Sequence, residues 1–397
     1  MNIDFKKKAD KKPKVSVMMA SYKHPLWIEE AIESVLNQTF KDLELIIVDD
    51  ASNDGSSEII KKYAKSDDRI KYKVFQKNKG AVAATHECYK MSSSSYLSLI
   101  SSDDIWELDK LQQQVLMLDS NKELGAVFAL PTFIDSNSLP IKTLKNEFSN
   151  SLKPNTRAEW MNFFFNKGNC ICHPTILIRK SCYEKVGFYN PALRSLPDFD
   201  MWVRLFFTYN VKVLDKKLIR FRKHDFNESR GTQANIIRNK TESKQILNQF
   251  IIQIKNIKSL IEIFPEHLDL FKLKDDTLIP FYIAQIALMK RDAFASDFAF
   301  DILYTEMAKP SVHKIIEENN LYSSVQLSQD VVLADIYKEG EWSKNTIYFK
   351  VPFLIKIEKK KKSSQSTFLI SILNIVILKR IKTLSSNLII FFGIKIR

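Results

Sequence analysis

The sequence predicts an α/β protein in which a mostly parallel sheet is flanked by helices, followed by a helical region and a short basic, apolar tail. Three observations support this prediction. Short apolar runs alternate with amphipathic stretches over residues 15–130, apolar residues recur at helical spacing from about 240 to 340, and lysines alternate with apolar residues after 341. Repeated strand–helix units favour a parallel sheet, because the crossover helices cover its faces.

The first third of the chain supplies the parallel strands. Apolar runs predict strands at 15–20, 43–48, 70–75 and 96–100. Helices are expected after Pro25, near 56–65, from Gly80 to about Met91, and around 111–118. Because the carboxyl ends of parallel strands meet at one edge of a sheet, the loops after Ala20, Val48 and Ile100 should converge on one crevice.

The next hundred residues are less regular. They predict a strand at 174–179, a helix at 198–207 and short strands at 211–214 and 218–221.

Composition and periodicity together divide the chain into four parts. These are a basic arm (1–14), an α/β domain (15–235), a helical region (236–340) and a basic amphipathic tail (341–397). Three tail segments each pair an apolar run with Lys or Arg, which suggests a degenerate repeat. They are 348–357, 370–382 and 389–396.

The net charge of +14 lies entirely at the two ends of the chain. Residues 1–14 hold six Lys against two Asp, and residues 341–397 hold 12 Lys or Arg against two Glu, whereas the 42 basic and 42 acidic residues between them cancel. A neutral body argues against a nucleic-acid-binding core, so no nucleic-acid partner is expected. The tail suits an anionic membrane surface, and a small β-rich appendage with a solvated basic face fits its composition equally well.

The expected compartment is the cytoplasm. Four cysteines form no dense framework, which favours a reducing environment. The Lys-rich start lacks the apolar stretch of a signal peptide. The apolar run 368–378 is too short to span a bilayer. We therefore expect a cytoplasmic protein, with peripheral contact at the inner face of the membrane as the role that the tail suggests.

Acidic side chains carry the strongest chemical signal. Asp49, Asp50 and Asp54 follow one predicted strand, and Asp103 and Asp104 follow another. Such carboxylate pairs would repel one another unless a cation or donor groups lie beside them. Hard oxygen ligands suit Mg²⁺ or Mn²⁺. The alternative is that Asp-rich turns cap the helices that follow them.

Five motifs occur in order along the first part of the chain. They are Val15-Ser-Val-Met-Met-Ala-Ser-Tyr22, Ser34-Val-Leu-Asn-Gln-Thr-Phe40, Leu45-Ile-Ile-Val-Asp-Asp-Ala-Ser-Asn-Asp-Gly-Ser56, Asn78-Lys-Gly80 and Ser102-Asp-Asp-Ile-Trp106. In this order and spacing they resemble the family 2 glycosyltransferases with the GT-A fold. The resemblance runs from about 14 to 235. It implies a Rossmann-like GT-A catalytic domain, a nucleotide-sugar donor that is usually a UDP-sugar, and a divalent metal, Mn²⁺ or Mg²⁺.

The resemblance also implies roles for single residues. Ala20 and Tyr22 would line the nucleotide pocket, with Asp49 and Asp50 at the nucleotide and Asp50 on its base. Asp103 would contact the ribose or the metal, and Asp104 would bind the metal on the donor diphosphate.

A later motif, Pro197-Asp-Phe-Asp-Met-Trp-Val-Arg204, resembles the family segment that carries the catalytic base. Asp198 matches the base best, and Asp200 is its rival. A base makes the acceptor oxygen nucleophilic, and a metal neutralises charge on the leaving diphosphate. One such displacement inverts the anomeric configuration. Asp198 could instead cap the helix. His224 resembles the family histidine beside the metal or diphosphate, and a structural role is its alternative.

Two positions depart from the family pattern. Thr85 stands where an Arg usually contacts the nucleotide, which puts donor affinity or identity in doubt, because a neutral hydroxyl cannot replace the charge. Ser101 stands where many relatives have an acid. The pair Asp103 and Asp104 still suffices for a metal.

Three functions follow for comparison. The leading one is an inverting transfer from a UDP-sugar to a saccharide or lipid-linked acceptor in surface polysaccharide biosynthesis, which rests on the resemblance. A sugar nucleotidyltransferase would need a glycine-rich phosphate loop after the first strand, where residues 20–24 contain no glycine. A non-catalytic membrane-associated protein would not need the carboxylates of Asp49, Asp50, Asp103, Asp104 and Asp198.

Overall fold

A computed structural model of the chain describes residues 12–141, 154–225, 227, 232–334, 346–349, 355–362, 365–372 and 375–381. Most of the basic arm and the third repeat-like segment, 389–396, lie outside the described residues. The chain forms two units, residues 1–334 and residues 335–397, and each is described by itself.

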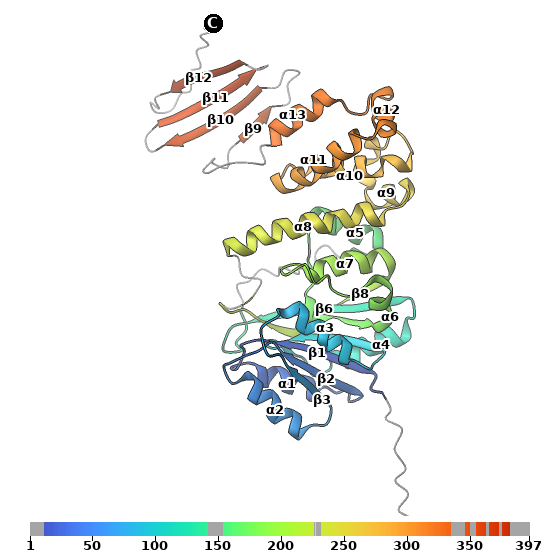
Figure 1. Ribbon diagram of the computed structural model, residues 1–397, viewed down its shortest axis with the longest axis vertical. Helices are drawn as coiled ribbons and strands as arrows, with labels where there is room; N and C mark the ends of the chain where they lie inside the picture. The colour runs from blue at the N-terminus through green and yellow to red at the C-terminus, as the bar shows by residue number, and fades with distance from the viewer. Residues whose placement is uncertain are drawn as a thin grey trace, which may run out of the picture. The chain divides into compact units, whose positions relative to one another are not determined.

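The first unit is built on an eight-stranded sheet with the order β3-β2-β1-β4-β7-β6-β8-β5 (Figure 1). The strands are β1 (Val15–Ser21), β2 (Leu43–Asp49), β3 (Ile70–Val74), β4 (Tyr96–Ser101), β5 (Ile105–Trp106), β6 (Leu124–Ile134), β7 (Leu177–Arg179) and β8 (Asn210–Arg222). Strands β1 to β4 pair in parallel. Beyond them β7 runs antiparallel to both β4 and β6, whereas β6 and β8 are parallel. The predicted α/β class is confirmed, and the second half of the sheet is mixed.

Helices cover the sheet and then continue as a separate layer. Those of the α/β part are α1 (Ile28–Leu36), α2 (Ser56–Ser66), α3 (Ala81–Met91), α4 (Lys110–Ser120), α5 (Arg157–Lys167), η1 (His173–Thr175), α6 (Lys180–Val186) and α7 (Pro197–Thr208). After them come α8 (Gln233–Gln253), α9 (Ile257–Ile263), η2 (Pro265–Leu270), η3 (Asp276–Leu278), α10 (Ile279–Met289), α11 (Ala293–Met307), α12 (Pro310–Glu318) and α13 (Ser324–Ala334).

Burial explains why the first strands form where the sequence predicts them. Every residue of β2 is buried, as expected for a central strand with helices on both faces. Helix α1 turns Ile28, Ala31, Ile32 and Val35 into the core shared with β1 and β2. Its apolar residues recur every three or four positions, which is the helical period.

The sequence analysis missed β6 and divided β8 in two. Strand β6 contains Pro131, which cannot donate a ladder hydrogen bond and is unusual inside a sheet. The β6–β8 register shifts between Leu130 and Pro131, and this irregularity accommodates the proline. The middle of β8, residues 215–217, is exposed and polar, so it resembles a turn although the strand continues through it.

The second unit contains a four-stranded antiparallel sheet with the order β12-β11-β10-β9. Its strands are β9 (Thr346–Phe349), β10 (Ile355–Lys362), β11 (Gln365–Ile372) and β12 (Ile375–Ile381). The first two repeat-like segments overlap these strands. Among the described residues, we find no helix with the length and apolar character that crossing a bilayer requires.

Helix α8 holds the loop that leads into α7. The Glu242 carboxylate of α8 is buried and accepts hydrogen bonds from the backbone N–H groups of Arg194, Ser195 and Leu196 at 2.9, 2.8 and 2.7 Å. A charged acceptor makes each of these bonds stronger than a neutral one would be. Because α7 begins at Pro197, this contact fixes its first turn.

We expect Glu242→Gln to lower the free energy of unfolding by about 1–3 kcal/mol, since the amide has one acceptor oxygen for three donors and turns its NH₂ group toward them. Urea unfolding followed by circular dichroism measures the change. Glu317→Gln on α12 is the matched control, because that side chain is 63% exposed. Equal unfolding curves for the two variants would contradict this role of Glu242.

Candidate active site

The strand ends meet at one edge of the sheet as expected. In the β1–β2 and β1–β4 registers, Ala20 lies beside both Val48 and Ser101. Ser21 pairs with Asp49, the last residue of β2. The loops after β1, β2 and β4 therefore leave the sheet side by side.

The two carboxylates after β2 bind backbone and hydroxyl donors. Asp49 is fully buried, and its Oδ2 accepts from the Ser52 N–H at 2.9 Å and the Ser57 hydroxyl at 2.8 Å. Asp50 accepts from the N–H groups of Lys79 and Gly80, both at 2.7 Å. Asp49 thus holds the start of α2, and Asp50 joins β2 to the Asn78-Lys-Gly80 turn.

The other residues expected near the nucleotide make fewer hydrogen bonds to the loops of the crevice than Asp49 and Asp50 do. Ala20 is partly buried near the end of β1, and Tyr22 is 40% exposed in the loop after the strand. The Thr85 hydroxyl donates to the Ala81 carbonyl within α3 at 2.8 Å. Thr85 therefore brings no charge to the crevice, and neither does Ser101 at the end of β4.

Asp103 and Asp104 lie together in the turn between β4 and β5. Asp103 Oδ2 is 2.8 Å from His224 Nε2 and accepts from the Asn227 amide at 3.3 Å. Asp104 Oδ1 accepts from the Arg222 N–H at 2.9 Å. The structure thus brings together Asp103, Asp104 and His224, three residues that the sequence analysis placed at the metal.

Asp104 carries an unsatisfied buried oxygen. Its Oδ2 has no hydrogen-bond partner among the described residues. Burial raises the pKa of Asp104 well above its usual value, and the neighbouring charge of Asp103 raises it further. Two adjacent buried carboxylates with an unsatisfied oxygen form a donor set that fits a divalent cation.

A histidine that the sequence analysis did not select completes this cluster. One ligand atom each of His24, Asp103 and His224 lies within 4.8 Å of the other two. His24 Nδ1 is 2.8 Å from the Ser102 hydroxyl. Burial lowers the pKa of His24. The sequence feature that could have identified His24 is its position in a loop that follows a strand of the predicted crevice.

Trp27 and Arg222 were also missed. The Trp27 indole stacks on the His224 ring with centroids 4.3 Å apart, and its Nε1 donates to the Ser136 carbonyl at 3.0 Å. Both contacts join segments far apart in the chain, so the sequence carries no local sign of them.

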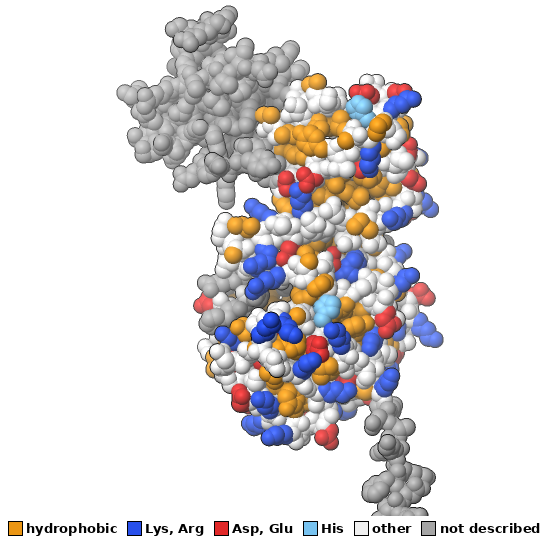
Figure 2. Space-filling view, in the orientation of Figure 1, with side chains coloured by type: hydrophobic (Ala, Val, Ile, Leu, Met, Phe, Trp, Pro, Cys, Tyr) orange, Lys and Arg blue, Asp and Glu red, His pale blue; other side chains and the backbone are white. Residues whose placement is uncertain are grey.

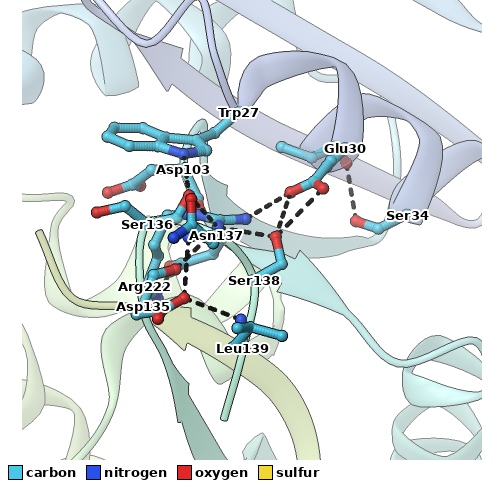
Figure 3. A network of polar contacts seen from close by, with 12 residues as sticks. Trp27, Glu30, Ser34, Asp103, Asp135, Ser136, Asn137, Ser138, Leu139 and Arg222 are labelled. Atoms are coloured by element: carbon cyan, nitrogen blue, oxygen red, sulfur yellow. Dashed lines mark hydrogen bonds and ion pairs between the residues drawn. The ribbon is translucent and has the colours of Figure 1, made fainter. Parts of the chain in front are cut away.

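The Arg222 guanidinium is fully buried at the centre of a polar network (Figure 3). Nε donates to the Asp103 carbonyl at 2.7 Å, Nη1 to the Asp135 carbonyl at 3.1 Å and the Ser138 hydroxyl at 2.9 Å, and Nη2 pairs with Glu30. Arg222 therefore fixes the turn that carries Asp103.

The two acids of α7 differ in their contacts. Asp200 is 3% exposed and pairs with Arg204 at 2.7 Å, while its other oxygen accepts from Gln249 at 3.3 Å. Asp198 accepts from the Asn169 amide at 3.0 Å. Burial raises the pKa of Asp198, and the nearby His173 opposes this shift.

Burial raises the pKa of the Cys172 thiol well above its usual value, and the charges of Asp104 and Asp198 add smaller effects in the same direction. On the face of the first unit seen in Figure 2, side chains of both signs are interspersed, in keeping with the neutral body.

Known proteins resemble this chain in sequence. The model of the glycosyl transferase family 2 matches residues 16–187. EpsE of Bacillus subtilis, whose name describes it as a glycosyltransferase, is 32% identical over 197 residues, which are 49% of this chain and 67% of EpsE. An uncharacterized glycosyltransferase of Methanocaldococcus jannaschii is 29% identical over 214 residues, 53% of this chain and 71% of that protein.

A solved structure shares the fold. TarS of S. aureus, residues 1–349 in complex with UDP-GlcNAc, gives a TM-score of 0.53 at 15% identity, over 85% of this chain and 95% of that one. This likeness supports the GT-A architecture of the first unit. The chain belongs to the family 2 glycosyltransferases.

Proposed function

We propose that this glycosyltransferase is metal-dependent and inverting, and that it moves a sugar from a UDP-sugar to a saccharide or lipid-linked acceptor in surface polysaccharide biosynthesis. The observation that supports the proposal most is the buried pair Asp103 and Asp104 beside His224, with one Asp104 oxygen that has no hydrogen-bond partner among the described residues. TuaG of Bacillus subtilis, whose name places it in teichuronic acid biosynthesis, is 39% identical over 104 residues, 26% of this chain and 41% of TuaG, and supports the acceptor class.

The donor would lie across the ends of β1, β2 and β4. We assign Ala20, Tyr22 and Asp50 to the nucleotide. Asp103 would lie next to its ribose. The UDP-GlcNAc bound to TarS supports a uridine nucleotide. Asp49 faces the start of α2, so its part in this site is to hold the loop that follows β2.

Asp103, Asp104 and His224 would hold the metal, Mn²⁺ or Mg²⁺. A divalent ion there would neutralise charge that develops on the leaving diphosphate. Arg222 supports both acids, because its backbone N–H bonds to the Asp104 carboxylate and its Nε bonds to the backbone carbonyl of Asp103.

Asp198 is the base in this proposal. Its contacts favour it over Asp200, whose oxygens are occupied by Arg204 and Gln249. A carboxylate whose pKa burial has raised accepts a proton more readily than an exposed one. Asp198 would take the proton of the acceptor hydroxyl while its oxygen attacks the anomeric carbon, and a single displacement inverts the configuration.

Purified protein with a panel of UDP-sugars and Mn²⁺ or Mg²⁺ tests the proposal. Transfer or hydrolysis releases UDP, and NMR of the first product gives the anomeric configuration. Retention of configuration would exclude the single displacement, and release with no dependence on metal would exclude the cation.

We expect Asp104→Asn to weaken Mn²⁺-dependent UDP binding by at least about tenfold, because an amide is a poorer ligand than a carboxylate. Calorimetry with UDP and Mn²⁺ measures this. Asn keeps an acceptor for the Arg222 N–H, so the turn should remain folded. Asp109→Asn, an exposed carboxylate before α4, is the control. Unchanged affinity in Asp104→Asn would remove Asp104 from the site.

Asp198→Asn should retain UDP binding and reduce transfer about 10²–10⁴-fold, the usual contribution of a general base. In the unsubstituted enzyme kcat/KM should fall as the pH drops through the pKa of Asp198, which lies above the usual 3.8, since only the carboxylate accepts a proton. The variant should lose this acidic limb. Near-normal turnover would assign the base elsewhere, with Asp200 next.

The tail is proposed to bind an anionic membrane surface. Each Lys or Arg near such a surface contributes about 1 kcal/mol. We expect the full chain to sediment with vesicles that contain phosphatidylserine, less so at high salt, and a chain lacking 341–397 to stay in the supernatant. Equal sedimentation of the two would make the tail a structural appendage.

A further inference from the structure

Three segments that are distant in the chain place nitrogen and oxygen ligands at one point. His24 lies in the loop between β1 and α1, Asp103 after β4, and His224 after β8. One ligand atom from each lies within 4.8 Å of the others. The side chains of His224 and Asp103 are only 2% and 9% exposed. The cluster is therefore a product of the tertiary fold rather than of neighbouring residues on a surface.

The two nitrogens of the His24 ring differ in their contacts. Its Nδ1 is 2.8 Å from the Ser102 hydroxyl, whereas its Nε2 has no hydrogen-bond partner among the residues described. With the proton on Nδ1 and donated to Ser102, the lone pair of Nε2 is available. Histidine ligands commonly have this arrangement, in which a partner on one nitrogen fixes the tautomer and the other nitrogen binds the metal.

Aromatic packing limits rotation of both imidazoles. The His24 ring centroid lies 5.5 Å from that of His224, with the two planes at 80°. Trp27 packs against both rings, with centroids 5.7 Å from His24 and 4.3 Å from His224. The Lys23 N–H also donates to the Ser52 hydroxyl at 2.9 Å, which holds the loop immediately before His24.

We propose that His24 is a further protein ligand of the metal, so that its imidazole joins His224 and the carboxylates that the proposed function assigns to the ion. This inference rests on the proposed metal dependence and adds His24 to its ligands. Asp104 does not belong to this group of close ligand atoms and lies next to it through Asp103.

A mixed nitrogen and oxygen set changes which ion the protein prefers. Mg²⁺ favours oxygen ligands and retains its waters. Imidazole suits transition ions, whose affinities rise from Mn²⁺ through Co²⁺ toward Zn²⁺. The site should therefore bind Mn²⁺ more tightly than Mg²⁺, and His24 should account for part of the difference.

Electron paramagnetic resonance on the full chain tests the ligand, with Mn²⁺ alone and Mn²⁺ with UDP as probes. Pulsed spectra should show ¹⁴N coupling from two imidazoles in the unsubstituted protein and from one in His24→Gln. The variant should bind Mn²⁺ at least about tenfold more weakly, with a smaller loss for Mg²⁺. His313→Gln on α12, a histidine 40% exposed, is the matched control and should change neither reading.

Ser102→Ala provides a second variant that leaves the ring in place. Loss of the Nδ1 partner should weaken Mn²⁺ binding and retain two-imidazole coupling, and circular dichroism checks that each variant is folded. Unchanged ¹⁴N coupling and Mn²⁺ affinity in His24→Gln would overturn the proposal, as would unchanged affinity in Ser102→Ala if His24→Gln does not fold. Neither the ¹⁴N coupling nor the Mn²⁺ affinity requires a sugar donor. Absence of sugar transfer would therefore overturn the proposed function without contradicting the assignment of His24 as a ligand.

Discussion

The buried guanidinium of Arg222 is the interaction on which the candidate site depends. It bonds to the turn after β4, to the loop after β6 and to Glu30 of α1, and its own backbone N–H holds Asp104. Removing a cation from water costs several kcal/mol, and that cost is offset only where the donors find acceptors and a counter-charge. Arg222 meets both conditions. Two loops and the first turn of α1 thus share one fixed point.

These contacts keep the carboxyl groups of Asp103 and Asp104 next to each other although the two charges repel. Asp103 and Asp104 repel one another, and burial strengthens that repulsion. The Arg222 N–H holds the Asp104 carboxylate, whereas His224 and Asn227 contact the Asp103 carboxylate. The protein therefore keeps both carboxyl groups together at the end of β4, where an ion and a diphosphate would meet them.

Local patterns were enough to predict strands β1 to β4 and the positions of the acidic pairs and the α7 acids, because each lies within one short segment of the chain. The structure confirms the α/β class and brings Asp103, Asp104 and His224 together. His24, Trp27 and Arg222 could not be predicted in the same way. Their contacts depend on how β8 aligns with β5 and β6, and a bulged strand that contains Pro131 hides that alignment. Asp49 and Asp50 lay where expected, and their hydrogen bonds show that an acid at a strand end can hold a loop.

The three N–H groups held by Glu242 bear on how such enzymes can be recombined. Helix α8 starts the helical layer, yet its carboxylate fixes the loop before Asp198, and its Gln249 reaches Asp200. A chimera that exchanged this layer between relatives would also exchange the support of the α7 acids. Chimeras designed to alter acceptor choice should therefore take the 194–196 loop and α8 together from the same parent protein.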